Sequence, residues 1–279
     1  MKLFPITAEH FKLDGGACFG VVPKTIWQKY LPADENNLVK VTSRCLLAET
    51  GNRLILVDTG MGNKQSERYF SFFHRFGEEN LETSFAKAGY SFDQVTDVIL
   101  THLHFDHVGG AVKNGSLPGT YEPVFPNATY YVSREQWDWT LNPNPREKAS
   151  FFPENYLPLY ENGQLEFIHE PGTFAEGVEI EFMNGHTRGL MVPIFDYKGR
   201  KVVFTTDFIA MVYNIPLPYV PGFDVEPLES MKEKETFLQR ALEQDFVLCF
   251  QHDHFNECCT LQMTGKGIRE KEIFKLADI

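Results

Sequence analysis

Thr101-His102-Leu103-His104-Phe105-Asp106-His107 is the most informative segment of this chain, because it places four metal-ligand side chains within six positions. The segment follows a short apolar run, so these side chains stand where a buried strand ends. His102 and His104 are two residues apart and point to the same side of an extended chain. Asp106 and His107 can then turn toward a second point. Since one metal ion needs three or four donors, the motif is expected to begin two sites.

Three later residues of metal-binding type also follow apolar runs. They are His186, Asp207 and His252. Each is weak evidence alone, but strand ends that meet at one edge of a sheet would bring all of them to the same place. His254 is an alternative to His252, which we prefer because it stands nearer the end of its strand.

Short apolar runs and helical patterns alternate along the chain. Strands are expected at 40–47, 53–57, 95–100, 129–132, 178–183, 201–205 and 246–250, and helices at 79–88 and 228–242. This mixture predicts a sheet-based core flanked by helices. The segments 142–160 and 211–227 are rich in proline and aromatic residues and are expected to be long loops near the candidate ligands. We therefore expect one domain over residues 1–279 with loop insertions at these two places.

Composition narrows the set of partners. The chain has 279 residues with 38 acidic and 26 basic side chains, a net charge of −12, which disfavours nucleic acid. No apolar run approaches the roughly 18 residues of a membrane helix, and the first residues do not resemble a secretory signal. The five cysteines lack paired spacing, which favours reduced thiols in the cytoplasm. A small-molecule substrate is expected, and the sequence leaves open whether the chain forms a homodimer.

Together these elements resemble the metallo-β-lactamase superfamily. The HxHxDH motif, the Gly-His pair at 185–186, Asp207 and His252 occur in its order, and segment 54–60 resembles its apolar strand followed by Asp-Thr-Gly. The resemblance spans roughly residues 45–254. It implies an α/β fold, a four-layer αββα sandwich of two mixed β-sheets flanked by helices.

The resemblance also implies a set of metal ligands. One ion would be held by His102, His104 and His186, and the other by Asp106, His107 and His252, with Asp207 bridging the two. Zinc suits donors rich in histidine, although manganese or iron also fits. Asp58 is expected to orient a ligand imidazole by accepting its second ring N–H. The alternative is that Asp58 simply ends a strand before the turn at Gly60.

Within the superfamily, His104 stands where the diiron flavoprotein branch has glutamate, which favours hydrolysis. The His-Leu-His-Phe-Asp-His form is most similar to the lactonase and arylesterase-like branch. Two departures are present. Many relatives read Gly-His-Thr-Pro-Gly-His, whereas this chain has Arg188 and Leu190 in place of the proline and the last histidine. Some acyl-homoserine lactonases carry a tyrosine three residues after the bridging aspartate, where this chain has Ala210, and Tyr213 is a candidate substitute.

The implied activity is metal-dependent hydrolysis. Two divalent ions would generate a bridging hydroxide that attacks a lactone, ester or thioester, with Asp207 holding the ions and Asp106 relaying a proton to the leaving group. Phosphoester or organophosphate hydrolysis at the same centre is the alternative. A non-catalytic metal-stabilised binding protein is disfavoured, because none of the donors is missing. Aromatic side chains are expected to form the substrate pocket: Phe105, Phe151, Phe152, Tyr213 and Phe223.

Overall fold

Six strands form the first of two large β-sheets in the computed structural model, which describes all 279 residues. In spatial order they are β1 (Lys2–Asp14), β2 (Leu38–Thr50), β3 (Arg53–Val57), β4 (Asp97–Ile99), β7 (Thr129–Ser133) and β8 (Leu165–Ile168). The pairs from β1 to β3 are antiparallel and those from β3 to β8 are parallel, so the sheet is mixed.

Seven strands form the second sheet. In spatial order they are β15 (Gly267–Phe274), β14 (Cys258–Thr264), β13 (Val247–Cys249), β12 (Arg200–Phe204), β11 (Leu190–Tyr197), β10 (Val178–Met183) and β9 (Gly172–Ala175). Only β12 and β13 pair parallel, so their carboxyl ends lie side by side at one edge. A separate hairpin joins β5 (Val112–Asn114) to β6 (Tyr121–Pro123).

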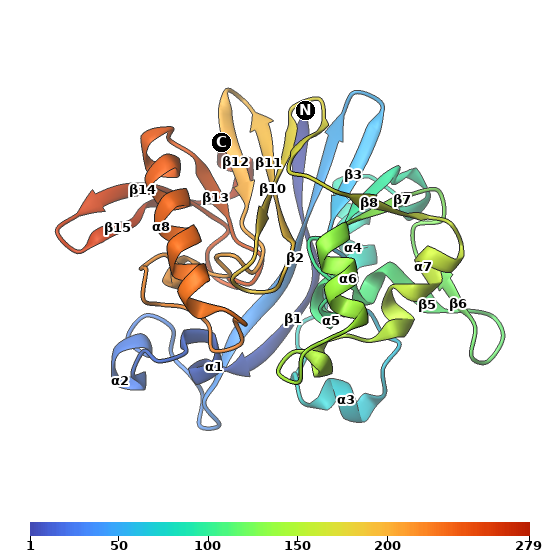
Figure 1. The fold of residues 1–279 in the computed structure, drawn as a ribbon, viewed down its shortest axis with the longest axis horizontal. Helices are drawn as coiled ribbons and strands as arrows, with labels where there is room; N and C mark the ends of the chain where they lie inside the picture. Colours follow the sequence, from blue (N-terminus) through green and yellow to red (C-terminus); the bar gives the residue numbers. More distant parts are fainter.

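Helices cover the outer faces of the two sheets (Figure 1). The α-helices of the chain are α1 (Gly15–Phe19), α2 (Lys24–Trp27), α3 (Glu67–Ser71), α4 (Leu81–Ala88), α5 (Phe105–Val108), α6 (Arg134–Leu141), α7 (Leu157–Glu161) and α8 (Pro227–Glu243). Figure 1 shows α8 over the second sheet and α4 and α6 beside the first. None of these helices combines the length and the apolar character that crossing a lipid bilayer requires.

Strand β3 shows how the layers are built. Successive side chains of a strand point to opposite faces, and those of β3 are buried on both. Leu54 and Leu56 join the core that includes Phe85 of α4. Ile55 joins the core between the sheets, which includes Val202 of β12. A third core packs α8 onto the far face of the second sheet. The molecule is thus an αββα sandwich, which confirms the fold class implied by the resemblance.

The expected elements agree with the structure where the apolar pattern is unbroken. The strands at 53–57 and 178–183 have the expected bounds, and the helices at 79–88 and 228–242 lie within two residues of α4 and α8 at each end. β1 was not expected, because a register shift between Thr7 and Glu9 interrupts its alternation. The segment 142–160 is not wholly irregular, since it contains two short 3-10 turns and the start of α7.

Lys234 of α8 fixes the segment 211–227 to the fold. Its buried ammonium donates to the carbonyl oxygens of Asn214, Pro216 and Tyr219 at 2.7, 3.0 and 3.3 Å. Lys234→Met should lower the free energy of unfolding by about 3 kcal/mol, because these carbonyls would lose their common donor. Denaturant unfolding of this variant measures the loss. The control is Lys232→Met on the same helix, whose side chain is 74% exposed; equal stabilities for the two variants would contradict the role.

Candidate metal centre

The donors of the HxHxDH motif follow the end of β4 in the first sheet. His104 precedes α5, so Asp106 and His107 lie in its only turn. The backbone N–H of Met191 in β11 donates to the carbonyl oxygen of Thr101 at 2.9 Å. This bond joins the two sheets beside the motif. The motif is therefore held at the edge where donors from the second sheet also emerge.

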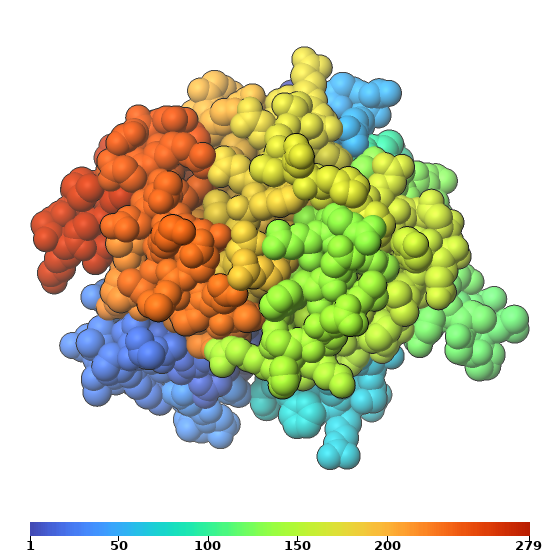
Figure 2. All heavy atoms as spheres, in the orientation of Figure 1, coloured from blue at the N-terminus to red at the C-terminus, as the bar shows by residue number.

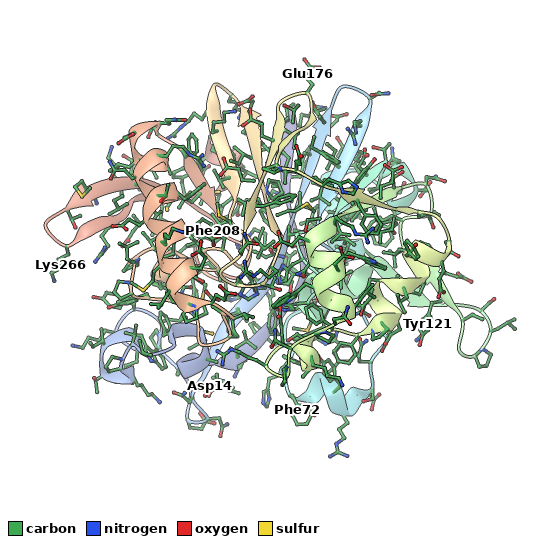
Figure 3. All side chains as sticks on the ribbon, in the orientation of Figure 1. Asp14, Phe72, Tyr121, Glu176, Phe208 and Lys266 are labelled. Carbon is green, nitrogen blue, oxygen red and sulfur yellow. The ribbon has the colours of Figure 1, made fainter.

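The remaining donors follow strand ends of the second sheet. His186 comes after β10, Asp207 after β12 and His252 after β13. Because β12 and β13 are parallel neighbours, Asp207 and His252 leave the sheet side by side. Phe208, the residue after Asp207, lies beside α8 in Figure 3 and its ring is 5.2 Å from that of Phe237. This packing anchors the turn that carries Asp207.

The structure brings the seven expected donors together in two clusters. In each cluster the ligand atoms lie within 4.8 Å of one another: His102, His104, His186 and Asp207 in one, and Asp106, His107 and His252 in the other. His186 Nε2 is 3.2 Å from His104 Nδ1, and His252 Nε2 is 3.2 Å from His107 Nε2. These separations suit two imidazoles that bind one ion, each with a metal–nitrogen bond of about 2 Å.

Asp207 lies between the clusters. Its Oδ2 is 3.2 Å from His186 Nε2, whereas its Oδ1 is 2.8 Å from His252 Nε2. One oxygen thus approaches each cluster. Burial opposes ionisation of this carboxyl, but the facing imidazoles, His252 first among them, lower its pKa well below the usual range. The carboxylate is therefore charged, as a metal ligand must be.

Two buried polar atoms in this region lack hydrogen-bond partners and are free to bind a metal ion. His102 Nε2 has no hydrogen-bond partner, and Asp207 Oδ1 accepts no well-directed hydrogen bond despite its short distance to His252. Buried polar atoms without partners are rare in folded proteins. Burial and the surrounding imidazoles lower the pKa of His102 well below its usual value, which keeps the ring neutral. Imidazole nitrogens and a carboxylate aimed at a common point are the donor set that zinc prefers.

Each of the five imidazoles also has a partner on its other nitrogen. The pairs are His102 with Thr101 Oγ1 (3.1 Å), His104 with Glu147 Oε1 (2.9 Å), His107 with Asp58 Oδ2 (2.9 Å), His186 with Asp224 Oδ1 (2.9 Å) and His252 with the carbonyl oxygen of Thr42 (2.8 Å). Such partners fix the orientation of metal-ligating histidines. The five rings are held in place by the protein itself.

Asp58 connects His107 to two further residues. Besides His107, its carboxylate accepts from the N–H and the hydroxyl of Thr101, both at 2.8 Å, and from the Gln251 amide at 2.9 Å. The residue has a φ of 58°, a backbone conformation that aspartate tolerates better than most side chains. Its contact with His107 is the geometry expected of a residue that orients a ligand, and that role stays a prediction.

Sequence reasoning missed Glu147 and Asp224. Glu147 also accepts from Trp139 Nε1 at 2.7 Å and from Asn144 Nδ2 at 2.9 Å. Although burial opposes ionisation, the hydrogen bond from His104 helps to hold the pKa of Glu147 at about 2. Asp224 accepts from Ser230 Oγ at 2.6 Å as well as from His186. The only signal in the sequence was that each is an acidic residue within one of the two expected loops.

Gly109 and Gly110, directly after the motif, allow two backbone segments to approach closely. A Cβ at Gly109 would lie 2.0 Å from the carbonyl oxygen of Met61, and one at Gly110 would lie 2.1 Å from that of Thr59. Thr59 in turn hydrogen-bonds the carbonyl oxygen of His107 through its N–H and its hydroxyl, both at 2.8 Å. The loop after β3 is thereby packed against the motif.

Four of the five expected pocket aromatics lie near the clusters. The ring of Phe151 is 5.0 Å from His104, and that of Phe223 is 5.9 Å from His186. Phe105, next to Asp106, and Phe152 have rings 6.3 Å apart. Phe105 contacts two aromatic residues that sequence reasoning missed, Tyr69 and Phe73. Phe152 contacts the first of these, Tyr69.

Two other candidates lie apart from the clusters. The Tyr213 hydroxyl accepts from Asn256 Nδ2 at 3.1 Å, and its ring packs against two hydrophobic cores. A pocket role for Tyr213 stays a prediction that these contacts do not support. His254 belongs to neither cluster, because its ring packs against His10 at 4.7 Å. Of the two alternatives, it is His252 whose side chain stands with the other donors.

The two expected loops meet beside the metal-binding residues. The Arg146 guanidinium of the first loop donates to the carbonyl oxygen of Gly222 in the second. Arg188, outside both loops, pairs with Glu226 of the second loop at 2.5 Å. In Figure 2 the lime-green surface of the first loop meets the orange surface of the second. The segments 142–160 and 211–227 thus form a continuous wall that also carries Phe223.

Comparisons with known proteins agree with this geometry. A family model described as Metallo-beta-lactamase superfamily matches residues 39–252. An N-acyl homoserine lactonase from Bacillus cereus is 25% identical over 233 residues, which cover 78% of this chain and 83% of that protein. A probable metal-dependent hydrolase from Staphylococcus aureus has a solved structure with a TM-score of 0.88 at 25% identity, covering 98% of this chain and 96% of the other. A dizinc quorum-quenching lactonase bound to a product has a TM-score of 0.80 at 22% identity, covering 98% and 94%, a likeness of fold.

Proposed function

The chain belongs to the metallo-β-lactamase superfamily and is a metal-dependent hydrolase, and on that premise we propose that it hydrolyses a small-molecule lactone, ester or thioester at a centre of two divalent ions. The observation that carries the proposal is the pair of donor clusters that share Asp207. Seven donors are too many for one four-coordinate ion. Zinc is the proposed metal, because imidazole nitrogens make up most of the donor set.

The residues that would hold the ions are the seven donors of the two clusters. When bound, the two ions would supply Lewis acidity and a hydroxide nucleophile at neutral pH. The protein's own contribution is orientation: Asp58, Glu147 and Asp224 fix three of the imidazoles. Asp106 is the least buried of the donors, with a side chain 13% exposed. It is therefore the donor best placed to pass a proton between the centre and the substrate's leaving group.

The substrate class follows from the wall beside the metals and from the relatives. Aromatic side chains beside His104 and His186 favour an apolar group on the substrate over a small, highly charged phosphate. The matched protein from Bacillus cereus is an N-acyl homoserine lactonase, so N-acyl homoserine lactones are the first substrates to test. Phosphoesters and organophosphates remain the alternative at the same centre.

The test combines metal analysis with a substrate panel. Protein purified without chelator should contain about two equivalents of metal per chain on the dinuclear model. It should turn over lactones, aryl esters or thioesters with higher kcat/KM than phosphodiesters or phosphotriesters. A reproducible value of one metal, unchanged by supplementation, would contradict the dinuclear centre. Turnover confined to phosphoesters would instead establish the alternative substrate class at an intact centre.

Phe223, half-buried beside His186, is expected to contact the apolar part of the substrate. Phe223→Ala should raise KM for a long-chain acyl lactone about tenfold and leave a short-chain analogue nearly unchanged, because only the long chain reaches the aromatic surface. Steady-state kinetics with both substrates measures the difference. Phe255→Ala serves as the control, since this side chain is 59% exposed and outside both clusters. Equal changes for both substrates would contradict the assignment of Phe223 to the wall.

A further inference from the structure

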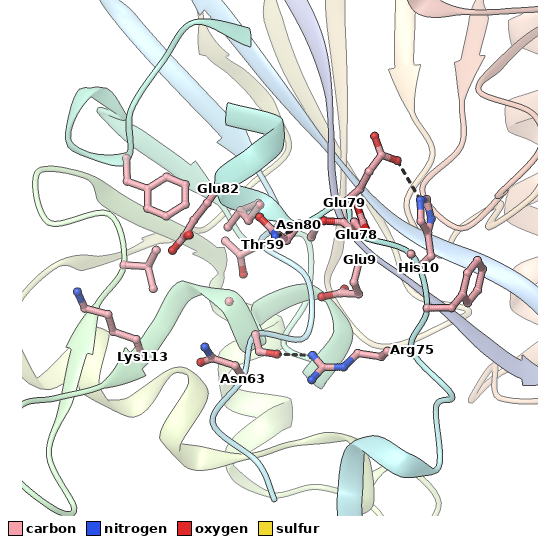
Figure 4. Close-up of a pocket in the computed structure, with 18 of the residues that line it drawn as sticks. Glu9, His10, Thr59, Asn63, Arg75, Glu78, Glu79, Asn80, Glu82 and Lys113 are labelled. Atoms are coloured by element: carbon pink, nitrogen blue, oxygen red, sulfur yellow. Dashed lines mark hydrogen bonds and ion pairs between the residues drawn. The ribbon is translucent and has the colours of Figure 1, made fainter. Parts of the chain in front are cut away.

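A second group of imidazoles lies outside both clusters. His10 of β1 and His254 face each other with their Nδ1 atoms 3.3 Å apart and their rings almost perpendicular. On its other side, His10 Nε2 hydrogen-bonds Glu79 Oε2 at 3.0 Å, as Figure 4 shows. Phe76 stacks on His10 and also contacts His254. The proposed hydrolytic centre uses none of these residues.

The His10–His254 pair resembles the imidazole pairs of the two donor clusters. Their facing imidazole nitrogens are 3.2 Å apart, nearly the distance between His10 and His254. In those clusters, His104, His107 and His186 each have a carboxylate on the far nitrogen, as His10 has Glu79. In the neutral ring, a carboxylate at that position fixes the tautomer, so the proton lies on the far nitrogen and the facing nitrogen can act as a donor. His10 therefore has the hydrogen bonding of a metal ligand.

We propose that His10 and His254 form a separate metal site, in which the two imidazoles bind Zn²⁺ or a similar transition-metal ion. Its remaining coordination positions are open to water or a small anion. Two surface cavities, of about 540 and 700 Å³, both include His10 and Glu79 in their linings, so an ion can reach the pair. The site is independent of the proposed hydrolysis, because it shares no donor with the two clusters.

Charges around the pair set its expected strength. Glu78 and Glu82 line the first cavity and attract a cation, whereas Glu79 already pairs with Lys87 at 2.9 Å. Lys40 opposes binding, since its ammonium lies 5.3 Å above the ring of Phe76. Arg44, which lines the second cavity, is engaged by the carbonyl oxygens of Phe250 and Asp253. Because it has only two protein donors and both acidic and basic neighbours, the site should bind zinc more weakly than either cluster.

Zinc titration of the purified protein tests the proposal. Calorimetry and elemental analysis, with ZnCl₂ as the only ligand, should find one more equivalent in the wild type than in His10→Asn or His254→Asn. His74→Asn and His169→Asn are matched controls, because both of these histidines are exposed and outside the pair. They should retain the wild-type count. Equal zinc content in all variants would overturn the proposal and leave only a hydrogen bond between the two imidazoles.

A second variant keeps the test decisive if an imidazole substitution disturbs folding. Glu79→Gln leaves both imidazoles in place and removes only the carboxylate that orients His10. It should weaken binding of the extra zinc about 10- to 100-fold, without changing the metal that the two clusters retain. An unchanged affinity would contradict the role of Glu79. A wild-type protein that binds this zinc but holds no metal in the clusters would instead contradict the dinuclear centre and leave this site standing.

Discussion

Asp207→Asn is expected to reduce hydrolysis at least about 1000-fold, equivalent to about 4 kcal/mol of transition-state stabilisation. The carboxylate approaches both clusters, with one oxygen 3.2 Å from His186 and the other 2.8 Å from His252. An amide is uncharged and offers only one oxygen. The variant should therefore fail to hold two ions at the spacing that activates water. Steady-state turnover measures the loss.

Metal content must be measured in the same sample, because the substitution can act by releasing an ion. Asp196→Asn is the control, since this side chain on β11 is 57% exposed and lies outside the clusters. It should retain the activity, metal and circular dichroism spectrum of the wild type. An Asp207→Asn protein with a full complement of metal and wild-type turnover would show that Asp207 does not bridge the two sites.

Asp58→Asn is expected to weaken metal binding about 10- to 100-fold. Asparagine has nearly the same shape and accepts the φ of 58°, so the fold should survive. However, Oδ1 accepts from the Thr101 N–H, and Oδ2 accepts from the Thr101 hydroxyl, His107 and Gln251. An amide has only one oxygen, so a side chain that keeps the bond from the Thr101 N–H turns its NH₂ group toward His107. His107 would then lose the partner that fixes its ring. Competition with a chelator of known affinity measures the change.

Asp93→Asn provides the comparison, because Asp93 is an exposed aspartate in the short 3-10 turn before β4. Its metal affinity should equal that of the wild type. The same affinity for Asp58→Asn would show that Asp58 is only a strand-ending aspartate, which is the alternative drawn from the sequence. A weakened affinity with unchanged thermal stability of the metal-free protein would separate the effect on His107 from a general loss of packing.

The sequence predicted those parts of the fold and site that depend on local pattern. β3 could be predicted because both of its faces are buried, which makes it a continuous apolar run. The seven donors could be proposed because each follows such a run. Glu147 and Asp224 could not, since they reach His104 and His186 from 43 and 38 positions away in the sequence. A contact of that kind leaves no periodic trace in the sequence.

The position of the donors between the sheets has a mechanical consequence. His104 and His186 are 82 residues apart in the chain, and His107 and His252 are 145 apart. An ion shared by either pair acts as a cross-link that closes a long loop, and cross-links of long loops restrict the unfolded chain most. The metals should therefore fasten one half of the sandwich to the other, much as a disulfide would in a secreted protein. Stripping them with a chelator should loosen the two halves from each other and expose the chain between them to proteolysis.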